Sequence, residues 1–304
     1  MIGANGFIGS HVVDALAAKG HEVTAFDRFS SGVTSFSAPN VTRHAGDFLN
    51  HADLADALAN QQFVFHFLST TTPAIADNEP TLDIRTNISQ SVDLFQLCAN
   101  AAIEKVYFAS TGGAIYGDQG LSRYRETDLA LPVSPYGIAK LTIEHYLRYF
   151  RAKHGLDSVS LRISNPYGNR QHPRKKQGLI PIALRQIASG APVLRFGSGA
   201  MIRDYIHVED VARLVAEMTG IENEHDVYNL GSGRGSTVNS VLETIRTVTK
   251  QDFDILQVPT PPTFVNEVVL DTSRISAEFS VDSFISLEEG IGRTWAGQLD
   301  SASL

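Results

Sequence analysis

The stretch Gly3-Ala4-Asn5-Gly6-Phe7-Ile8-Gly9, followed by an amphipathic run that begins at Ser10, decides the fold. Its glycines recur every three residues directly before a helical pattern, which is typical of a turn that binds a dinucleotide. One glycine permits the sharp turn, the second lets the backbone approach a pyrophosphate, and the third lets the helix pack closely. The positive end of the helix then faces the anion. We expect Gly3, Gly6, Phe7, Ile8 and Gly9 to contact the cofactor.

Asp27 supports this interpretation, because it ends the next predicted strand and lies 18 residues beyond Gly9. A carboxylate at this position accepts hydrogen bonds from the adenosine ribose hydroxyls and repels a 2′-phosphate. The sequence therefore favours NAD over NADP, with Arg28 as the residue that keeps NADP open. The alternative is that the glycines only turn the chain and that Asp27 caps a loop.

Apolar runs and helical patterns alternate through the first 165 residues, which indicates an α/β protein. The runs are dense in β-branched and aromatic residues, as in a parallel sheet that is buried on both faces. We expect strands at Glu22–Asp27, Gln62–Leu68, Lys105–Ser110 and Ser158–Ser164, and helices at Ser10–Lys19, Ser89–Ala102 and Ile138–Lys153. The predicted fold class is a Rossmann-like, doubly wound parallel sheet with a smaller C-terminal α/β part.

The texture changes after Asn165, where glycines and prolines interrupt short elements. We expect residues 1–165 to form the NAD-binding domain, with 204–230 returning to it. Residues 166–304 would mainly bind the substrate, and Pro259–Pro262 would be a loop within them rather than a linker.

The chain begins at Met1-Ile2, so the first strand of the expected sheet is almost entirely absent. That strand is central in a doubly wound sheet. Losing about five buried aliphatic side chains, at roughly 1.5–3 kcal/mol each, would remove a free energy comparable to the ~5–15 kcal/mol stability of a whole domain. We therefore expect the natural protein to begin several residues upstream.

Composition and charge exclude several classes of protein. A net charge of -8 and a pI near 5.7 argue against a nucleic-acid binder. The short basic cluster Arg170, Arg174, Lys175 and Lys176 is interpreted as a solvated loop. No segment approaches the ~20 apolar residues that cross a membrane. A lone cysteine, Cys98, and no signal-like leader predict a cytoplasmic protein.

Metal chemistry is not expected either. The histidines His11, His21, His44, His51 and His66 show no spacing typical of a ligand cluster. We expect most of them to be surface or packing residues.

Tyr136 and Lys140 are the candidate reactive pair, since four residues within the predicted helix place them on one face. An ammonium beside a phenol favours the phenolate, so Lys140 and a positive nicotinamide ring are expected to lower the pKa of Tyr136 and make it a general base. Lys140 can also hold the nicotinamide ribose. Ser110 and Thr111 end a strand that we place beside the cofactor, and their hydroxyls can bond the same substrate oxygen as Tyr136. We choose Thr111 as the hydroxyl donor, because it is nearer the glycine turn, and leave Ser110 as the alternative.

Further stretches match one known family. They are GANGFIGS from Gly3, Asp27, Gly46-Asp47, His66-Phe67-Leu68-Ser69, Asn87, STGGAIYG from Ser110, SPYGIAK from Ser134, Asn165-Pro166-Tyr167-Gly168 and Arg203-Asp204-Tyr205-Ile206-His207-Val208. Over nearly its whole length the chain resembles the extended short-chain dehydrogenase/reductase family. The resemblance is closest to the NAD-dependent epimerase/dehydratase members of the UDP-glucose 4-epimerase type.

The resemblance implies NAD as cofactor and a UDP-hexose as substrate. It implies further NAD contacts at Asp47, Phe48, Phe67, Leu68, Ser69, Asn87, Ser110, Tyr136 and Lys140, and substrate contacts at Thr111, Tyr136, Asn165, Leu179, Phe196 and Arg203. Arg203 suits a phosphate because its guanidinium can bond two oxygens, and Phe196 suits a base that stacks. Core packing would explain Phe196 and Leu179 almost as well. A homodimer through Ser89–Ala102 and Ile138–Lys153 is also implied.

Two departures from the family pattern bear on activity. Many relatives carry Ser or Thr where this chain has Gly112, and an Arg on the diphosphate where it has Pro261, Pro262 and Thr263. A 4,6-dehydratase needs an acid and a base directly after the catalytic Thr, but here Gly112 and Gly113 follow Thr111.

These residues favour a 4-epimerase that oxidises C4 transiently. Another nucleotide-sugar enzyme, namely a dehydratase, decarboxylase or reductase, and a non-catalytic NAD-binding sensor remain alternatives. The intact Tyr136 and Lys140 disfavour the sensor. The choice between a 2-hydroxyl and a 2-acetamido sugar stays open.

Overall fold

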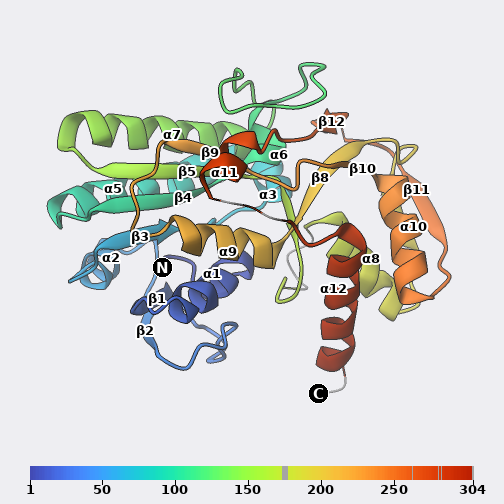
Figure 1. The fold of residues 1–304 in the computed structure, drawn as a ribbon, viewed down its shortest axis with the longest axis horizontal. Coiled ribbons are helices and arrows are strands. Elements are labelled where there is room, and N and C mark those ends of the chain that lie inside the picture. The colour runs from blue at the N-terminus through green and yellow to red at the C-terminus, as the bar shows by residue number, and fades with distance from the viewer. Residues whose placement is uncertain (173–176, 262, 280, 282, 303–304) are drawn as a thin grey trace.

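A computed structural model describes residues 1–172, 177–261, 263–279, 281 and 283–302. Figure 1 shows a twisted parallel sheet with helices on both faces, beside a smaller part built from short strands and the helices α8, α10 and α12. The predicted class, a doubly wound α/β fold with a smaller C-terminal part, is confirmed.

The main sheet is parallel throughout. Its strands are β1 (Val23–Asp27), β2 (Val41–Ala45), β3 (Phe63–His66), β4 (Lys105–Thr111), β5 (Asp157–Ile163) and β9 (Val227–Leu230). β3, β4, β5 and β9 pair in that order, and β1 pairs with β2. Every residue of β4 is buried, as the continuous apolar run predicts for a central strand. The predicted strands lie within two residues of the observed bounds.

Ile2 joins the two halves of this sheet. It forms parallel bridges to Phe26 of β1 and to His66 of β3. Its N–H donates to the carbonyl of Phe65 at 2.8 Å, and its own carbonyl accepts from the N–H of Phe67 at 3.0 Å. Ile2 therefore occupies the central position of the sheet, where the sequence pattern places the first strand.

Helices cover both faces of the sheet (Figure 1). α1 (Phe7–Ala18) and α9 (Val208–Met218) pack together on one face, over a core that includes Val13, Leu161 and Leu214. α2 (His51–Ala57), α5 (Ser89–Asn100) and α7 (Pro135–His154) cover the other face, over a second core around Phe95 and Ile143. The apolar spacing of the predicted helices thus marks the faces that meet the sheet.

The smaller part is organised around β8 (Ile202–His207). This strand pairs with β6 (Asn165–Tyr167), β10 (Gly235–Thr237) and β12 (Glu267–Val268), while β7 (Val193–Phe196) pairs with β11 (Ile255–Val258). Its helices α8 (Leu179–Ala188), α10 (Val238–Thr249) and α12 (Leu287–Ala302) enclose a third core. The chain passes from the main sheet to the smaller part between β5 and β6. It returns to the main sheet where α9 follows β8.

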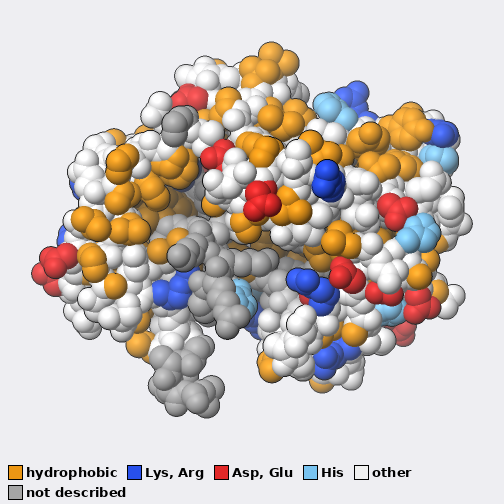
Figure 2. Space-filling model, turned by 180° about the vertical axis from the view of Figure 1, so that it is seen from behind, with side chains coloured by type: hydrophobic (Ala, Val, Ile, Leu, Met, Phe, Trp, Pro, Cys, Tyr) orange, Lys and Arg blue, Asp and Glu red, His pale blue; other side chains and the backbone are white. Residues whose placement is uncertain are grey.

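Short elements complete the chain: α3 (Pro73–Asn78), α4 (Pro80–Asp83), a π-helical turn η1 (Ile84–Ile88), α6 (Gly112–Ile115) and α11 (Ser273–Glu278). None of the helices in the described residues is long and apolar enough to cross a membrane. On the face seen in Figure 2, acidic and basic side chains are interspersed, and apolar side chains gather over its upper half.

Candidate active site

The glycine turn leaves no room for side chains. A Cβ on Gly9 would lie 2.1 Å from the carbonyl oxygen of Gly3, and one on Gly3 would lie 2.8 Å from the amide nitrogen of Leu68. Gly3 also has a φ of +85°, which favours glycine. The predicted reasons for these glycines, a sharp turn and a close approach of helix to strand, therefore match the geometry.

Helix α1 begins at Phe7, three residues earlier than predicted, so Gly9 lies in its first turn, while Gly3 and Gly6 come before the helix. Gly6 is its N-cap and supplies no side-chain cap. The first amide groups of a helix have no partner within the helix. Asp27 lies against this turn, since its Oδ2 accepts the N–H of Asn5 at 3.0 Å. The structure thus brings the unpaired amides and the predicted ribose-binding carboxylate together.

Tyr136 and Lys140 lie in the first two turns of α7. Ser134 caps this helix by accepting the N–H of Gly137 at 3.2 Å, and Pro135 opens it. A Cβ on Gly137 would lie 2.6 Å from the carbonyl oxygen of Ala114, so glycine lets the helix start close to α6. The Lys140 ammonium is 5.8 Å from the centre of the Tyr136 ring. The predicted pair is therefore assembled.

The ionisation of this pair differs from the prediction. Lys140 Nζ donates to the carbonyl oxygen of Ala109 at 2.8 Å rather than to the phenol. Burial raises the pKa of Tyr136 to about 12, and the nearby charge of Asp83 adds to this rise. In the protein alone the pKa of Tyr136 is therefore not lowered, because removal of the phenol from water has the largest effect. The expected lowering by Lys140 together with a nicotinamide ring stays a prediction. Burial also lowers the pKa of Lys140 to about 8, against the opposing charges of Asp83 and Glu144.

Ser110 and Thr111 have different surroundings. The hydroxyl of Ser110 donates to Oε1 of Glu144 at 2.5 Å. That carboxylate also binds Arg162, at 2.8 Å and 3.2 Å, in a buried ion pair. No hydrogen bond joins the hydroxyl of Thr111 to another described residue, and this hydroxyl does not cap α6. Only Thr111 has an uncommitted hydroxyl next to the glycine pair.

Gly112 is glycine for a packing reason. A Cβ there would lie 2.4 Å from Cδ1 of Leu270 and 2.8 Å from the carbonyl oxygen of Arg162. A Ser or Thr, which many relatives carry at this position, would not fit against Leu270 without rearrangement. At Gly113 a Cβ would lie 3.5 Å from the amide of Asn165, which is ordinary contact.

A buried network that no sequence motif indicates holds the loop after β3. Asn87 accepts the N–H of Thr70 at 2.9 Å and donates to Thr71 Oγ1 at 2.9 Å and to Asp83 Oδ1 at 2.5 Å. Thr71 Oγ1 also donates to Asp83 Oδ1, and Ser69 Oγ donates to the carbonyl of Thr71. The Asn87 side chain is thus engaged within the protein, where it orders the 69–71 loop. No local pattern marks Asp83, because Pro80–Asp83 reads as the first turn of a helix.

Most of the residues that we expect to lie near the adenine and the rest of NAD pack against the protein cores. The Phe48 ring is buried in the second core, 5.2 Å from the ring of His66. Phe67 and Leu68 are half-buried and pack on the two cores. Asp47 Oδ1 accepts the N–H of Leu49 at 3.0 Å. Phe48 can therefore face a ligand through its backbone but not through its ring.

Arg203 and Asn165 lie on neighbouring strands, β8 and β6. The Arg203 guanidinium donates to the carbonyl oxygens of Ile202, Asn266 and Val265, at 2.8, 3.2 and 2.6 Å. Asn165 donates to the carbonyl of Asp204 at 2.9 Å. Arg203 therefore fastens the segment before β12, part of which (Pro262) lies outside the described residues.

Phe196 borders a cavity of about 260 Å³ in the smaller part, and Leu179 does not. The cavity is lined by Phe196, Gly197, Ser198, Gly199, Ala200, Met201, Thr260 and Asn266. Phe196 is 37% exposed and meets Phe264 edge to face, with the ring centres 5.3 Å apart. Leu179, the first residue of α8, is half-buried and packs on the third core.

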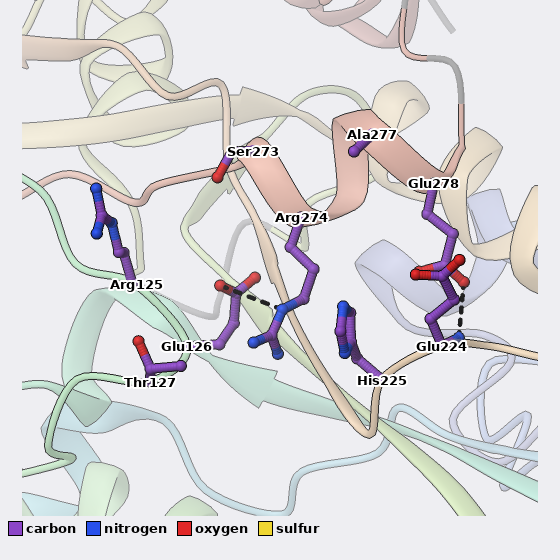
Figure 3. Close-up of a pocket in the computed structure, with 9 residues that line it drawn as sticks. All are labelled: Arg125, Glu126, Thr127, Glu224, His225, Ser273, Arg274, Ala277 and Glu278. Carbon is purple, nitrogen blue, oxygen red and sulfur yellow. Dashed lines mark hydrogen bonds and ion pairs between the residues drawn. The ribbon is translucent and has the colours of Figure 1, made fainter.

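A second, larger cavity of about 530 Å³ lies elsewhere, between α11 and the loops at Arg125–Thr127 and Glu224–His225 (Figure 3). Its charged groups are partly paired, as with Arg274 and Glu126 at 3.8 Å. Glu224, His225 and Glu278 have ligand atoms within 4.8 Å of one another, and sequence spacing did not suggest this group. Both Glu278 oxygens already accept hydrogen bonds, from the Glu224 N–H and the Tyr228 hydroxyl. Nothing here resembles the chemistry at Tyr136, so we place the reactive site at α7 despite the size of this cavity.

Of the basic cluster, Arg170 pairs with Asp14 of α1 at 2.7 Å. Arg174, Lys175 and Lys176 lie outside the described residues. His11 of α1 contacts the carbonyl of Asn169 at 3.2 Å. The chain after β6 is thus tied to the helix that carries the glycine turn.

Comparison with known proteins gives a consistent family. Residues 1–231 match the model of the NAD dependent epimerase/dehydratase family. A UDP-glucose 4-epimerase from Thermotoga maritima, solved with UDP-glucose, is 33% identical, with a TM-score of 0.93 over 99% of this chain and 98% of its own. A UDP-glucose 4-epimerase from Thermus thermophilus, solved with NAD, is 31% identical, with a TM-score of 0.89 over 97% of each chain. A dTDP-4-dehydro-6-deoxyglucose reductase from Escherichia coli is 34% identical over 235 residues, 77% of this chain and 74% of its own.

Proposed function

We propose, from the premise that this chain belongs to the NAD dependent epimerase/dehydratase family, that it is a nucleotide-sugar 4-epimerase acting on a UDP-hexose. The observation that carries the proposal is the assembly of Tyr136, Lys140 and the uncommitted Thr111 hydroxyl at the carboxyl end of β4. The likeness to two UDP-glucose 4-epimerases over nearly the whole of each chain supports it.

The described residues fit NAD as the cofactor. The cradle formed by Gly3, Gly6 and Gly9 would be filled by any Cβ, and the first amides of α1 are left for an anion. Asp27 at the adjacent turn suits a ribose with free hydroxyls. Phe7, Ile8, Ser69 and the backbone of Phe48 border this cradle in our proposal. When bound, NAD supplies the acceptor and donor of the hydride exchanged with sugar C4.

The chain supplies the proton chemistry. Tyr136 takes the proton of the C4 hydroxyl as the C4 hydrogen leaves as hydride, and returns a proton to O4 when the hydride comes back to the opposite face of the sugar. Thr111 donates a hydrogen bond to the same oxygen. Lys140, held by the Ala109 carbonyl, places a positive charge beside the Tyr136 ring and would bind the nicotinamide ribose. The sugar changes configuration at C4 and no cofactor is consumed.

The smaller part would hold the nucleotide. Phe196, with Phe264 beside it, offers a stacking surface at the mouth of the 260 Å³ cavity. Arg203 and Asn165, on the neighbouring strands β8 and β6, would bind the diphosphate in our proposal. We accordingly assign residues 1–165 and 204–230 to cofactor binding and the rest of 166–304 mainly to the substrate.

A reductase acting on a 4-keto nucleotide sugar is the second candidate, because the Escherichia coli reductase is 34% identical. The same Tyr136 would then donate a proton to the keto oxygen while an external reduced cofactor is consumed. The two activities differ in whether a reduced cofactor disappears in proportion to product.

The decisive experiment is incubation of the purified protein with UDP-glucose, UDP-galactose or their N-acetyl forms, followed by chromatographic separation of the sugars. We expect interconversion at C4 with no net change in absorbance at 340 nm. Turnover only when NADH or NADPH and a 4-keto sugar are added would replace the epimerase with the reductase.

We also propose that the protein is a cytoplasmic homodimer. Ile138, Tyr146 and Tyr149 project from α7, each 38–50% exposed, beside α5. A two-fold symmetric helix bundle would bury this face. The lone cysteine, Cys98, is buried and fits a reducing compartment. Sedimentation at micromolar concentration tests the dimer, and a monomer would contradict it.

A further inference from the structure

Asp83 is a buried carboxylate beside the reactive pair. It is 1% exposed and ends α4, directly before the π-helical turn η1. Both elements pack against α7, the helix that carries Tyr136 and Lys140. Single π-turns within helices are frequent at functional sites. The position of Asp83 therefore indicates that its charge affects the reactive pair.

The two carboxylate oxygens of Asp83 have different surroundings. Oδ1 accepts hydrogen bonds from Thr71 and Asn87, whereas Oδ2 is buried and has no partner among the described residues. A buried carboxylate with an unsatisfied oxygen is costly unless a positive charge lies near it. No described cation forms an ion pair with Asp83 within 4.0 Å. A positive charge that stabilises this carboxylate must therefore act from a greater distance.

The charged and titratable groups around Lys140 identify the partner. They are Asp83 from α4, Tyr136 and Glu144 from α7, Arg162 from β5 and His66 from β3. Arg162 forms a bidentate ion pair with Glu144. Burial keeps His66 neutral, since it lowers the pKa of this imidazole to about 3. Lys140 is thus the one described cation in this group that has no dedicated acidic partner, and Asp83 is the one acid without a cation.

We propose that Asp83 is a positioning residue of the active site, the counter-ion that keeps the buried Lys140 in its charged form. Lys140 needs such a partner, because it is 7% exposed and its ammonium otherwise contacts a backbone carbonyl and the face of Phe108 at 4.7 Å. Asp83 opposes the effect of burial, which lowers the pKa of Lys140 to about 8. The network from Thr70 to Asn87 holds the carboxylate in place.

The inference deepens the proposed function, which needs a charged Lys140 beside Tyr136. Its first test does not depend on that function. Protein labelled with ¹³C at lysine Cε is titrated by NMR, and the Lys140 signal is assigned from its loss in Lys140→Met. In Asp83→Asn the amide oxygen can still accept from Thr71 and Asn87, while the charge is gone. We expect the pKa of Lys140 to fall by about one unit, as is usual when a nearby opposite charge is removed.

Two variants serve as controls. Asp83→Glu keeps the charge, and we expect it to restore the pKa of Lys140 towards that of the parent protein. Asp77→Asn removes an exposed carboxylate from the neighbouring helix α3 (Pro73–Asn78), and we expect no shift. An unchanged Lys140 titration in Asp83→Asn overturns the proposal. So does loss of the native circular dichroism in both Asp83→Asn and Asp83→Ser, which would make the carboxylate a requirement of folding.

The second test is the pH profile of kcat/KM for C4 interconversion. Charged Lys140 is lost as pH rises through its pKa, so a lower pKa moves the alkaline limb to lower pH. A fall from about 8 to about 7 reduces the charged fraction at pH 8 from one half to about one tenth, a fivefold loss of kcat/KM. A purely structural role would lower the whole profile without moving it. If no sugar is epimerised but the NMR shift occurs, the proposed function fails and the role of Asp83 stands.

Discussion

The hydroxyl of Ser110 donates a hydrogen bond to Oε1 of Glu144 at 2.5 Å, whereas the hydroxyl of Thr111, the next residue, bonds to no other described residue. Alternation along β4 points their side chains to opposite faces of the sheet. Ser110 therefore belongs to the buried Glu144–Arg162 cluster under α7, and Thr111 faces the other way, next to Gly112.

This difference predicts which hydroxyl supports the substrate oxygen. Thr111→Val keeps the shape and deletes the hydrogen bond, so we expect kcat to fall by the equivalent of ~1–3 kcal/mol. Ser110→Ala is expected to affect stability more than kcat, because it leaves a buried acceptor on Glu144. Steady-state rates and denaturant unfolding of both variants are compared. A larger loss of kcat in Ser110→Ala, with Thr111→Val nearly silent, would reverse the assignment.

Tyr136→Phe removes the proton acceptor and little volume. We expect turnover to fall ~10²–10⁴-fold, the usual contribution of general acid–base catalysis, while NAD stays bound. Cofactor retention is followed by the absorbance of the denatured supernatant. The matched control is Tyr146→Phe, which changes an exposed tyrosine nearly three turns further along α7. A parental kcat in Tyr136→Phe would exclude the proposed mechanism.

Local signals predicted much of this fold. The glycine spacing, the buried runs of β3, β4 and β5, and the stripe of Ile143, Leu147 and Phe150 on α7 all depend on residues close in sequence. β2 was missed because Val41–Ala45 is an exposed edge strand with no apolar run. The start of α1 at Phe7 was missed because its N-cap residue, Gly6, has no side chain that could mark the start of a helix in the sequence.

The charges around the reactive pair could not be predicted in the same way. Asp83, Glu144 and Arg162 come from three elements that meet only after folding, and each has an ordinary local context. The raised pKa of Tyr136 in the protein alone could not be predicted for the same reason, because proximity to Lys140 was visible in the spacing but the depth of burial was not. The prediction that Lys140 and a bound nicotinamide together lower this pKa stays a prediction.

Gly9→Ala tests the cradle. The added Cβ would lie 2.1 Å from a backbone oxygen of Gly3, which cannot move aside as a side chain could. We expect the free energy of unfolding to drop by ~1–3 kcal/mol and NAD affinity to fall with it, because the turn must open. Gly292→Ala in α12 is the control, since its Cβ would lie 3.7 Å from Val248, an ordinary contact. Equal NAD affinity in Gly9→Ala and the parent, by titration calorimetry, would show that the turn does not hold the cofactor.

His66 predicts a specific loss of stability in acid. Its pKa is about 3 in the folded protein, chiefly because it is buried, and ~6.5 when unfolded. Above pH 6.5 neither state binds the proton. Below it only the unfolded state does, so stability falls by ~1.4 kcal/mol per pH unit, or ~2 kcal/mol between pH 6.5 and 5.

His66→Gln keeps a polar group for Ser91, which His66 contacts at 2.7 Å, but cannot be protonated. We expect this variant to lose ~2 kcal/mol less than the parent over that interval in urea unfolding. Parallel slopes in the parent and His66→Gln would mean that the buried imidazole accepts a proton without unfolding.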